Sequence, residues 1–483
     1  MSVGKVWLVG AGPGDPGLLT CRAREVLERA EVVIFDRLVG DGVLALMPRA
    51  ARCIDVGKEG GRHPVPQREI EALIVREALD GRNVVRLKGG DPFLFGRGGE
   101  EVEALLAHGI PYEVVPGVTS AVAAPECAGI PVTHRGLANS LHIVTAHTKE
   151  GGIAAQDYDA LARLDGTLVF LMGATAIAEI CSHLMSRGFA TDTPMAAVER
   201  GTTARQRALV GTLGDFERKA RDFELRPPAV ILVGTVAALA SQFAWRQTLP
   251  LRDKKVLVTR PANRQGRLSR MLRDLGAEVV EFPCIAAVPL ETKLPPLDGH
   301  DWIGFTSATG VECFFARLTA EGRDVRELGA AKIAAVGPAT AAALRERGLR
   351  PDLIPAVYDG VHLGAELAKR GGSVLLFRAL DGSPELTETL RGRGVDFDEV
   401  PLYRTETLAA PFQPADVDAV LFTSASTVRG FKKACPGLEA PLACCIGVQT
   451  AREAERLGLK NIRVAARATL EDLVNILKED GQP

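Results

Sequence analysis

The chain has 483 residues, a length that predicts three or four domains rather than a single core. Hydrophobic residues make up 46% of the chain and charged residues 24%, as in soluble globular proteins. The net charge of −2 gives no reason to expect a nucleic-acid partner. No apolar run reaches the ~18 residues that a membrane helix needs, and the N-terminus lacks the layout of a signal peptide. The nine cysteines are scattered without zinc spacing, so we expect buried thiols in a cytoplasmic protein with no metal site.

The chain begins with a predicted strand–helix–strand unit. It consists of a strand at 5–9, a glycine-rich loop, a helix at 21–30 and a strand at 31–35. This order suggests a dinucleotide site, but Asp15 replaces the third glycine of that fingerprint and Pro13 removes a backbone donor. Because the fingerprint is incomplete, a nicotinamide-dependent oxidoreductase is kept only as an alternative interpretation.

Asp36 ends the second of these strands. A carboxylate at the carboxyl end of a parallel strand points into the crevice where α/β proteins bind ligands. The same residue would also serve as the cap of the next segment, and the local sequence leaves both roles open.

The most informative stretch is residues 84–101, Val-Val-Arg-Leu-Lys-Gly-Gly-Asp-Pro-Phe-Leu-Phe-Gly-Arg-Gly-Gly-Glu-Glu. A buried strand is predicted to end at the Gly-Gly-Asp turn, and a helix to begin at the two glutamates. Glycine has no Cβ and tolerates positive φ, so this turn leaves room for a ligand beside bare backbone. The Asp-Pro step prevents the strand from continuing.

This stretch resembles the central motif of the uroporphyrinogen-III C-methyltransferases, and the resemblance extends over about residues 3–245. It implies two α/β lobes with S-adenosylmethionine in the cleft between them. The cofactor-binding residues that it implies are Pro13, Gly89, Gly90, Asp91, Leu94, Thr119, Ser120, Met172, Gly201 and Ala229.

The same resemblance implies two catalytic residues, Asp36 as proton acceptor and Lys58 as proton donor. A lysine is more often a solvated surface residue. The family usually has tyrosine before the aspartate, whereas this chain has Phe35, so any role of that hydroxyl is absent here. Arg135 is expected to bind a substrate carboxylate, with a surface ion pair as the alternative.

Further strand ends and helix starts follow along the first half. Residues 112–121 form a strand, a Pro-Gly turn and a helix start, where Thr119 and Ser120 would cap the helix, contact the cofactor, or do both. A strand at 140–145 and a polar link near 148–165 come next. A second lobe is expected to begin with the strand at 167–173, whose Met172 is otherwise a core residue.

A polar link at 246–255 leads into a second half in which three signals occur twice, about 110 to 118 residues apart. The repeated turns within 305–311, 422–428, 335–341 and 445–451 each follow a predicted strand and begin a helix. The paired segments are 256–260 and 374–378, 305–311 and 422–428, and 335–341 and 445–451. Two similar α/β lobes that face each other are therefore expected, with hydroxyls and free N–H groups at the helix starts.

Here the chain resembles uroporphyrinogen-III synthase, over about residues 253–480. The resemblance implies one lobe of 253–285 plus 405–480 and another of 286–404. It makes Tyr403 a cleft residue with a catalytic role, although packing at the hinge would also explain a tyrosine there. The expected substrate-binding residues are the hydroxyls of the repeated turns, Thr306, Ser307, Thr340, Thr423, Ser424 and Thr450.

Together these resemblances imply an α/β protein with a two-lobed methylase fold at 1–248, followed by a two-lobed synthase fold of duplicated parallel-sheet lobes at 253–483. The expected enzyme closes hydroxymethylbilane to uroporphyrinogen III without a cofactor, then methylates it twice from S-adenosylmethionine. A homodimer through the methylase half is expected, with no nucleic-acid or membrane partner. A second half that senses an anionic ligand without turnover remains an alternative.

Overall fold

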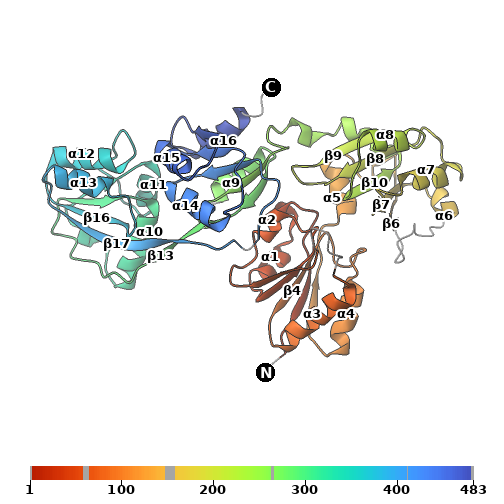
Figure 1. The fold of residues 1–483 in the computed structure, drawn as a ribbon, viewed down its shortest axis with the longest axis horizontal. Helices are drawn as coiled ribbons and strands as arrows, with labels where there is room; N and C mark the ends of the chain where they lie inside the picture. The colour runs from red at the N-terminus through yellow and green to blue at the C-terminus, as the bar shows by residue number, and fades with distance from the viewer. Residues whose placement is uncertain (1–2, 58–64, 147–157, 263–265, 411, 480–483) are drawn as a thin grey trace. The chain divides into compact units, whose positions relative to one another are not determined.

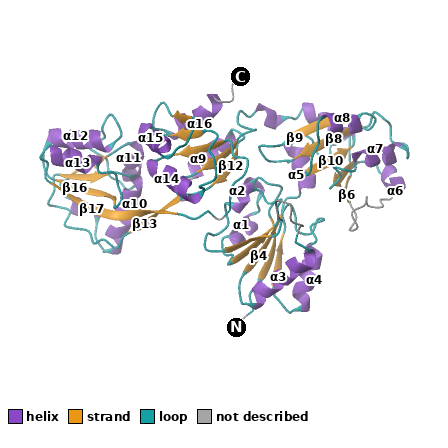
Figure 2. Ribbon diagram, in the orientation of Figure 1, coloured by secondary structure: helices purple, strands orange, loops and turns teal. Residues whose placement is uncertain are grey.

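The computed structural model describes residues 3–57, 65–146, 158–262, 266–410 and 412–479. In this part of the chain, four five-stranded sheets form the fold, and helices cover them (Figures 1 and 2). The chain divides into two compact units, Met1–Pro283 with Ala409–Pro483, and Cys284–Leu408. The first unit holds three of the sheets and the second unit holds one. Among the described residues, no helix is both long and apolar enough to span a bilayer.

The first sheet has the order β3-β2-β4-β1-β5, and all its neighbouring strands are parallel. Its strands are β1 (Val6–Gly10), β2 (Val32–Phe35), β3 (Arg52–Asp55), β4 (Val84–Lys88) and β5 (Tyr112–Val115). Its helices are α1 (Cys21–Leu27), α2 (Asp41–Leu44), α3 (Gln67–Leu79) and α4 (Gly98–Ala107). Apolar residues of α1 and α2 pack on one face and those of α3 and α4 on the other, so both faces are buried.

The second sheet has the order β6-β7-β10-β8-β9 and is mixed. Only β6 and β7 are parallel, and the other three pairings are antiparallel. Its strands are β6 (Leu141–Thr145), β7 (Thr167–Leu171), β8 (Pro194–Glu199), β9 (Arg207–Thr212) and β10 (Ala229–Val233). Its helices are α5 (Ser120–Cys127), α6 (Tyr158–Ala162), α7 (Ile177–Met185) and α8 (Phe216–Asp222), with 3-10 turns at Thr235–Ser241 and Trp245–Thr248.

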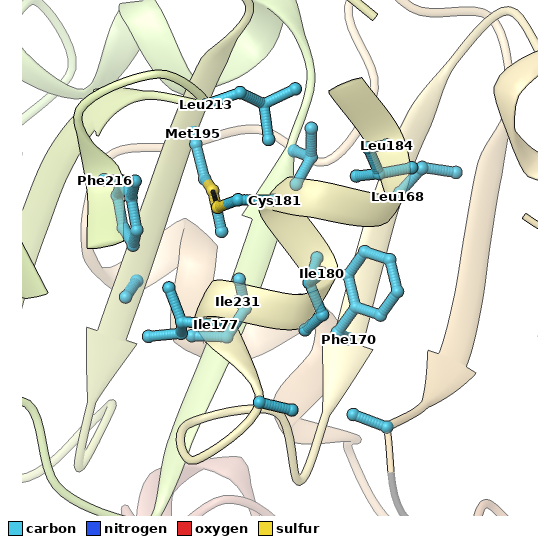
Figure 3. Close-up of a cluster of buried hydrophobic side chains, with 14 of the residues drawn as sticks. Leu168, Phe170, Ile177, Ile180, Cys181, Leu184, Met195, Leu213, Phe216 and Ile231 are labelled. Carbon is cyan, nitrogen blue, oxygen red and sulfur yellow. Dashed lines mark hydrogen bonds between the residues drawn. The ribbon is translucent and has the colours of Figure 1, made fainter. Parts of the chain in front are cut away.

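Two cores stabilise this second sheet. On one face, Ile177, Ile180 and Leu184 of α7 point toward the sheet and belong to one cluster with Phe170 and Phe216 (Figure 3). On the other face, α5 contributes Ala121 and Ala124 to a cluster with Val198 and Leu232. Helix α5 follows β5 of the first sheet, so it connects the two lobes.

The third sheet has the order β12-β11-β18-β19-β20 and is parallel throughout. Its strands are β11 (Lys255–Val258), β12 (Glu278–Glu281), β18 (Ala419–Phe422), β19 (Ala443–Cys445) and β20 (Ile462–Val464). Its helices are α9 (Gly266–Asp274), α14 (Ala425–Ala434), α15 (Val448–Arg456) and α16 (Leu470–Glu479). Residues of α9 and α16 share one buried cluster with β11 and β18.

The fourth sheet, in the second unit, has the order β13-β17-β16-β14-β15. Its strands are β13 (Ile285–Pro289), β14 (Trp302–Phe305), β15 (Lys332–Ala335), β16 (Val374–Ala379) and β17 (Phe397–Thr407). Its helices are α10 (Ala308–Ala320), α11 (Pro338–Glu346), α12 (Gly360–Arg370) and α13 (Glu385–Gly392). Helices α10 and α11 pack on one face and α12 and α13 on the other. Only β13, at one edge, is antiparallel to its neighbour.

The duplicated lobes of the second half are confirmed by the strand order. The repeated segments supply β11, β18 and β19 in one sheet and β16, β14 and β15 in the other, adjacent and in the same spatial order. Each of the four repeated Thr/Ser and Gly turns lies between a strand and a helix, as predicted. The second unit extends slightly beyond the predicted lobe 286–404, because β13 and β17 pair from Ile285 with Thr407 onward.

Several local predictions were wrong. The first helix ends at Leu27 rather than near Ala30, and α4 begins at Gly98, before the glutamates. The supposed polar link near 148–165 contains α6, whose Tyr158 and Leu161 are buried, and residues 147–157 lie outside the described ones. Five of the nine cysteines are buried as predicted, but Cys21 is exposed.

Candidate active site

Two glycine-rich turns of the first sheet cross each other at the carboxyl ends of β1 and β4. The Gly90 N–H donates to the Gly12 carbonyl at 2.8 Å, and the Gly12 N–H donates to the Gly90 carbonyl at 3.2 Å. Gly117, after β5, approaches so closely that a Cβ on it would lie 2.2 Å from the Gly90 carbonyl oxygen. The three turns therefore meet backbone to backbone, which only glycine permits.

Gly90 leaves open space beside the start of α5. Its φ of +68° is in the left-handed region. Among the described residues, a Cβ built on it would meet just one atom within 4 Å, the Ser120 backbone nitrogen at 3.9 Å. Thr119 caps α5 by accepting from the Ala121 N–H at 3.2 Å, so Ser120 is the first helical residue. Open space next to bare backbone and a helix start suits a ligand with carboxylate or hydroxyl oxygens.

Asp91 holds the turn together. Its Oδ1 accepts from the backbone N–H groups of Phe93 and Leu94, at 2.9 and 3.1 Å, and its Oδ2 accepts from the Gly117 N–H at 3.1 Å. Both carboxylate oxygens are therefore engaged by backbone. The structure gives Asp91 a clear role in shaping the turn, while its cofactor contact and those of Gly89 and Leu94 stay predictions.

Strand ends of the second lobe lie against this region at two points. A Cβ on Gly201 would lie 2.4 Å from the Ala124 Cβ of α5, and the Asp15 N–H donates to Thr202 Oγ1 at 3.3 Å. Thr202 is itself in the left-handed region with a φ of 72°. The loop that holds Pro13 and the turn that holds Gly201 are thus brought together.

Two further predicted contacts lie at strand ends of the second sheet. Met172 directly follows β7, has a φ of 58° and is 51% exposed. The prediction that it is not simply a core residue is therefore consistent with its exposure. Ala229 is half-buried, begins β10 and pairs with Glu199 of β8.

Asp36 follows β2 and is held by a residue that the sequence interpretation missed. Arg86 Nη2 donates to Asp36 Oδ1 at 2.5 Å, and Arg86 Nε donates to Glu101 Oε1 at 2.9 Å. The available signal was Arg86 and Lys88, two cations with the same-face spacing of a strand, in a run that is otherwise apolar. Lys58 lies outside the described residues. Arg135 is exposed, in the turn that the His134–Ala138 bridge closes.

In the second unit, Tyr403 lies on β17 and is 8% exposed. Its hydroxyl and Ser307 Oγ are hydrogen-bonded at 2.9 Å. Ser307 also caps α10 by accepting from the Gly310 N–H at 2.9 Å. Tyr403 is thus connected to a repeated Ser turn, next to the half-buried Thr306.

The predicted hydroxyls of the first unit form a second set. Ser424 caps α14 in a capping box with Thr427, next to the half-buried Thr423. Thr450 of α15 and its counterpart in the second unit, Thr340 of α11, are only 4% and 3% exposed. Burial gives these two threonines a packing role, and their substrate contacts stay predictions.

The geometry defines a two-lobed α/β protein with a backbone-lined site at strand ends, followed by duplicated α/β lobes. Residues 5–217 match the family model of the tetrapyrrole (corrin/porphyrin) methylases, and residues 266–475 match that of uroporphyrinogen-III synthase HemD. The porphyrin biosynthesis protein HemD of Ruminiclostridium josui is 44% identical over 100% of this chain and 99% of its own. The uroporphyrinogen-III C-methyltransferase of Bacillus subtilis is 40% identical over 72% of each chain.

The solved uroporphyrin-III C-methyltransferase of Thermus thermophilus, complexed with S-adenyl homocysteine, is 44% identical with a TM-score of 0.43 and covers 49% of this chain and 100% of its own. The full-length relative places both family matches in one polypeptide. The chain belongs to the tetrapyrrole-biosynthesis family in which a uroporphyrinogen-III C-methyltransferase is joined to a HemD-type uroporphyrinogen-III synthase.

Proposed function

We propose that this chain closes hydroxymethylbilane to uroporphyrinogen III in its second half and methylates that product twice in its first half, giving precorrin-2. The observation that carries the methylase assignment is the crossing of Gly12 and Gly90 beside the Ser120 N–H, where a Cβ would occupy open space. The family membership supports the pairing with a synthase, because the product of one reaction is the substrate of the other.

The cofactor of the first half is S-adenosylmethionine, which supplies the methyl group when it is bound. The open space at Gly90 and the N–H groups at the start of α5 fit its amino-acid and ribose oxygens. Met172 and Gly201, at strand ends of the second lobe, would line the other side. Their task is to align donor and acceptor, since alignment supplies much of the acceleration of a displacement reaction.

Asp36 is the proton acceptor in this proposal. When bound, S-adenosylmethionine would transfer its methyl group to a pyrrole carbon of the substrate. The methylated ring system then loses a proton to the Asp36 carboxylate. This loss removes the positive charge that the ring system gained with the methyl group. Lys58 would donate a proton, and Arg135 would bind a substrate carboxylate, whose charge suits a guanidinium.

The second half uses no cofactor. Its task is to hold a flexible linear tetrapyrrole so that closure with inversion of the last ring prevails over simple closure. Hydroxyls and N–H groups at the starts of α10 and α14 suit the carboxylates of such a substrate. Tyr403, bonded to Ser307, is the candidate catalytic residue there.

Titration tests the proposal against the alternatives. Calorimetry of the full chain with S-adenosylmethionine, and separately with NAD and NADP, is expected to show binding of the first alone. Methyl transfer to supplied uroporphyrinogen III should follow. Binding of a nicotinamide nucleotide without methyl transfer would instead favour the oxidoreductase. The proposed enzyme is a cytoplasmic homodimer that associates through its methylase half.

A further inference from the structure

The first sheet contains a buried chain of charges that ends at Asp36. Side chains alternate along a strand, so Arg86 and Lys88 of β4 lie on one face, with Arg86 opposite Ile34 of the neighbouring β2. Both cations are almost fully buried, with Arg86 1% exposed and Lys88 3% exposed. Glu101 of α4, which covers this face, is 1% exposed.

The contacts join Lys88, Glu101, Arg86 and Asp36 in that order, and Lys88 and Asp36 both lie at the carboxyl end of the sheet. Lys88 Nζ donates to Glu101 Oε1 at 3.0 Å, and Arg86 Nε donates to the same oxygen at 2.9 Å. Arg86 Nη2 then donates to Asp36 Oδ1 at 2.5 Å. The Arg86 Nη1 also points at the carbonyl oxygens of Ile34 and Leu87, both at 3.4 Å. The guanidinium is therefore held on several sides before it meets Asp36.

The neighbouring carboxylates keep the buried Arg86 ionised. Burial on its own would lower the pKa of Arg86, but the charges of Glu101 and Asp36 outweigh that effect and raise it. The pKa of Lys88 is lowered, first by burial and then by the charge of Arg86. Of the four side chains, Asp36 alone is substantially exposed, at 30%.

Stability is a weak explanation for this arrangement. Burying charges costs several kcal/mol per ion, and well-packed apolar residues in place of a buried ion pair are often as stabilising or more so. In addition, Glu101 Oε2 is buried and has no hydrogen-bond partner among the described residues, which makes the cluster costlier still. A stabilising element would not need to reach a partly exposed carboxylate at the carboxyl end of β2.

We propose that Arg86, anchored by Glu101, is a positioning residue for methyl transfer that fixes the orientation of the Asp36 carboxylate at the carboxyl end of β2. This inference rests on the proposed function, in which Asp36 accepts the proton from the methylated ring. Arg86 and Glu101 act through Asp36 and touch neither substrate nor cofactor. Fixed geometry matters here, since a misplacement of about 1 Å can cost about 10²-fold in rate.

The test is a mutant cycle in the full chain, with uroporphyrinogen III and S-adenosylmethionine as substrates. Arg86→Lys keeps the charge but loses the forked geometry, so kcat is expected to fall about 10- to 10²-fold. The KM for uroporphyrinogen III and the Kd for S-adenosylmethionine should stay within about two-fold, because binding does not depend on Asp36. In an Asp36→Asn background, Arg86→Lys should change kcat less than about three-fold, because its effect passes through the lost carboxylate.

A matched control is available in the same lobe. Glu77 of α3 is also 1% exposed and receives hydrogen bonds from Arg52 and Arg82, yet the structure places it outside the chain that leads to Asp36. Glu77→Gln should leave kcat unchanged. Glu101→Gln should lower kcat about 3- to 10-fold, since it loosens the anchor of Arg86 but keeps the volume of the side chain.

The outcomes separate the two claims. If Asp36→Asn keeps the wild-type kcat, the proton acceptor of the proposed function is wrong. If Asp36→Asn is impaired but Arg86→Lys is either normal or fully additive with it, the positioning role alone is overturned. If Arg86→Lys loses its fold, shown by lost S-adenosylmethionine binding, Glu101→Gln decides, and a wild-type kcat in that variant overturns the inference.

Discussion

Gly90 is the residue on which the predicted cofactor site depends most directly. Its positive φ and the open space beyond it were inferred from a Gly-Gly-Asp turn, and the structure has both. A larger side chain at Gly90 would also strain the backbone of the turn. A left-handed conformation costs an L-residue roughly 1–2 kcal/mol, so substitution destabilises the lobe as well as filling the site.

A pair of glycine substitutions separates these two effects. Gly109 has a similar φ of +63° and lies in the same lobe, and no atom of the described residues lies within 4 Å of the position that its Cβ would take. Gly90→Leu and Gly109→Leu should lower the melting temperature to a similar extent, but only Gly90→Leu should abolish S-adenosylmethionine binding in calorimetry. Equal binding by both variants would place the cofactor elsewhere.

Tyr403 is the corresponding residue in the synthase half. Removing its hydroxyl by Tyr403→Phe breaks the bond to Ser307 at little change in volume. We expect slower formation of the type-III ring, measured by chromatographic isomer analysis, with more of the type-I isomer from unassisted closure. Tyr158→Phe is the matched control, since the Tyr158 hydroxyl is buried without a partner among the described residues. An unchanged isomer ratio in Tyr403→Phe would contradict a catalytic role and leave Tyr403 with a packing role alone.

At the scale of elements, local patterns predicted which segments are strands and helix starts, because burial and capping depend on neighbouring residues. The strand at 140–145 is β6, Leu141–Thr145, and Ser307 and Ser424 cap helices. Sheet order was harder. Nothing local distinguishes β10, which lies between β7 and β8 and is antiparallel to both, from a strand in a parallel sheet.

The candidate site was predictable where it is made of backbone and missed where it is made of long-range contacts. Glycines at strand ends indicate in the sequence where the backbone is accessible to a ligand. The bond from Arg86 to Asp36 joins residues 50 positions apart, and its anchor Glu101 looks like an ordinary acidic residue of a first helical turn. Only the sheet register, which sets β2 beside β4, brings them together.

One element makes a pH-dependent prediction. Glu113 of β5 accepts from Lys5 Nζ at 2.8 Å, from Trp7 Nε1 at 3.0 Å and from Arg22 Nε at 2.9 Å. These bonds, above all that from Lys5, lower the pKa of Glu113 to about 2. A carboxyl with a depressed folded-state pKa stabilises the protein fully above its unfolded pKa, and that contribution is lost as the pH falls toward the folded value.

Glu113→Gln should therefore lower the melting temperature at pH 7 by a few degrees, about 2–4 °C if the cluster contributes about 1 kcal/mol. The difference from wild type should shrink as the pH is lowered from about 5 toward 2. Glu28→Gln, which removes a more exposed ion pair with Arg24, is the control and should show little difference at any pH. A pH-independent difference for Glu113→Gln would contradict the electrostatic account.

In the whole molecule, the chain passes from one half to the other over fewer residues than the predicted polar link at 246–255. The Trp245 indole N–H donates to the Glu126 carbonyl, which ties that residue to α5 of the methylase. Leu251 is fully buried in the core of the third sheet, and its N–H donates to the Leu275 carbonyl at 2.9 Å. The synthase half therefore needs Leu251, two residues before its predicted start.

Cutting the chain between Leu249 and Pro250 leaves the Trp245–Glu126 bond in one fragment and the buried Leu251 in the other. We expect a fragment of residues 1–249 to methylate supplied uroporphyrinogen III, and a fragment of residues 250–483 to close hydroxymethylbilane, each at a rate within about ten-fold of the full chain. A second cut after Asp253 is the control, because it strips Leu251 from the core and should destabilise the synthase fragment. A synthase fragment that folds but never closes the substrate would contradict the assignment of that half.

One polypeptide that carries out both reactions in sequence needs only hydroxymethylbilane and S-adenosylmethionine, so the decisive experiment supplies the full chain with hydroxymethylbilane and methyl-labelled S-adenosylmethionine alone. The products are then separated by chromatography and assigned by isomer and by the number of labelled methyl groups. We predict a type-III product that carries two labelled methyl groups, namely precorrin-2. Unmethylated type-I ring as the sole product, or unconsumed hydroxymethylbilane beyond its spontaneous closure, would contradict the claim.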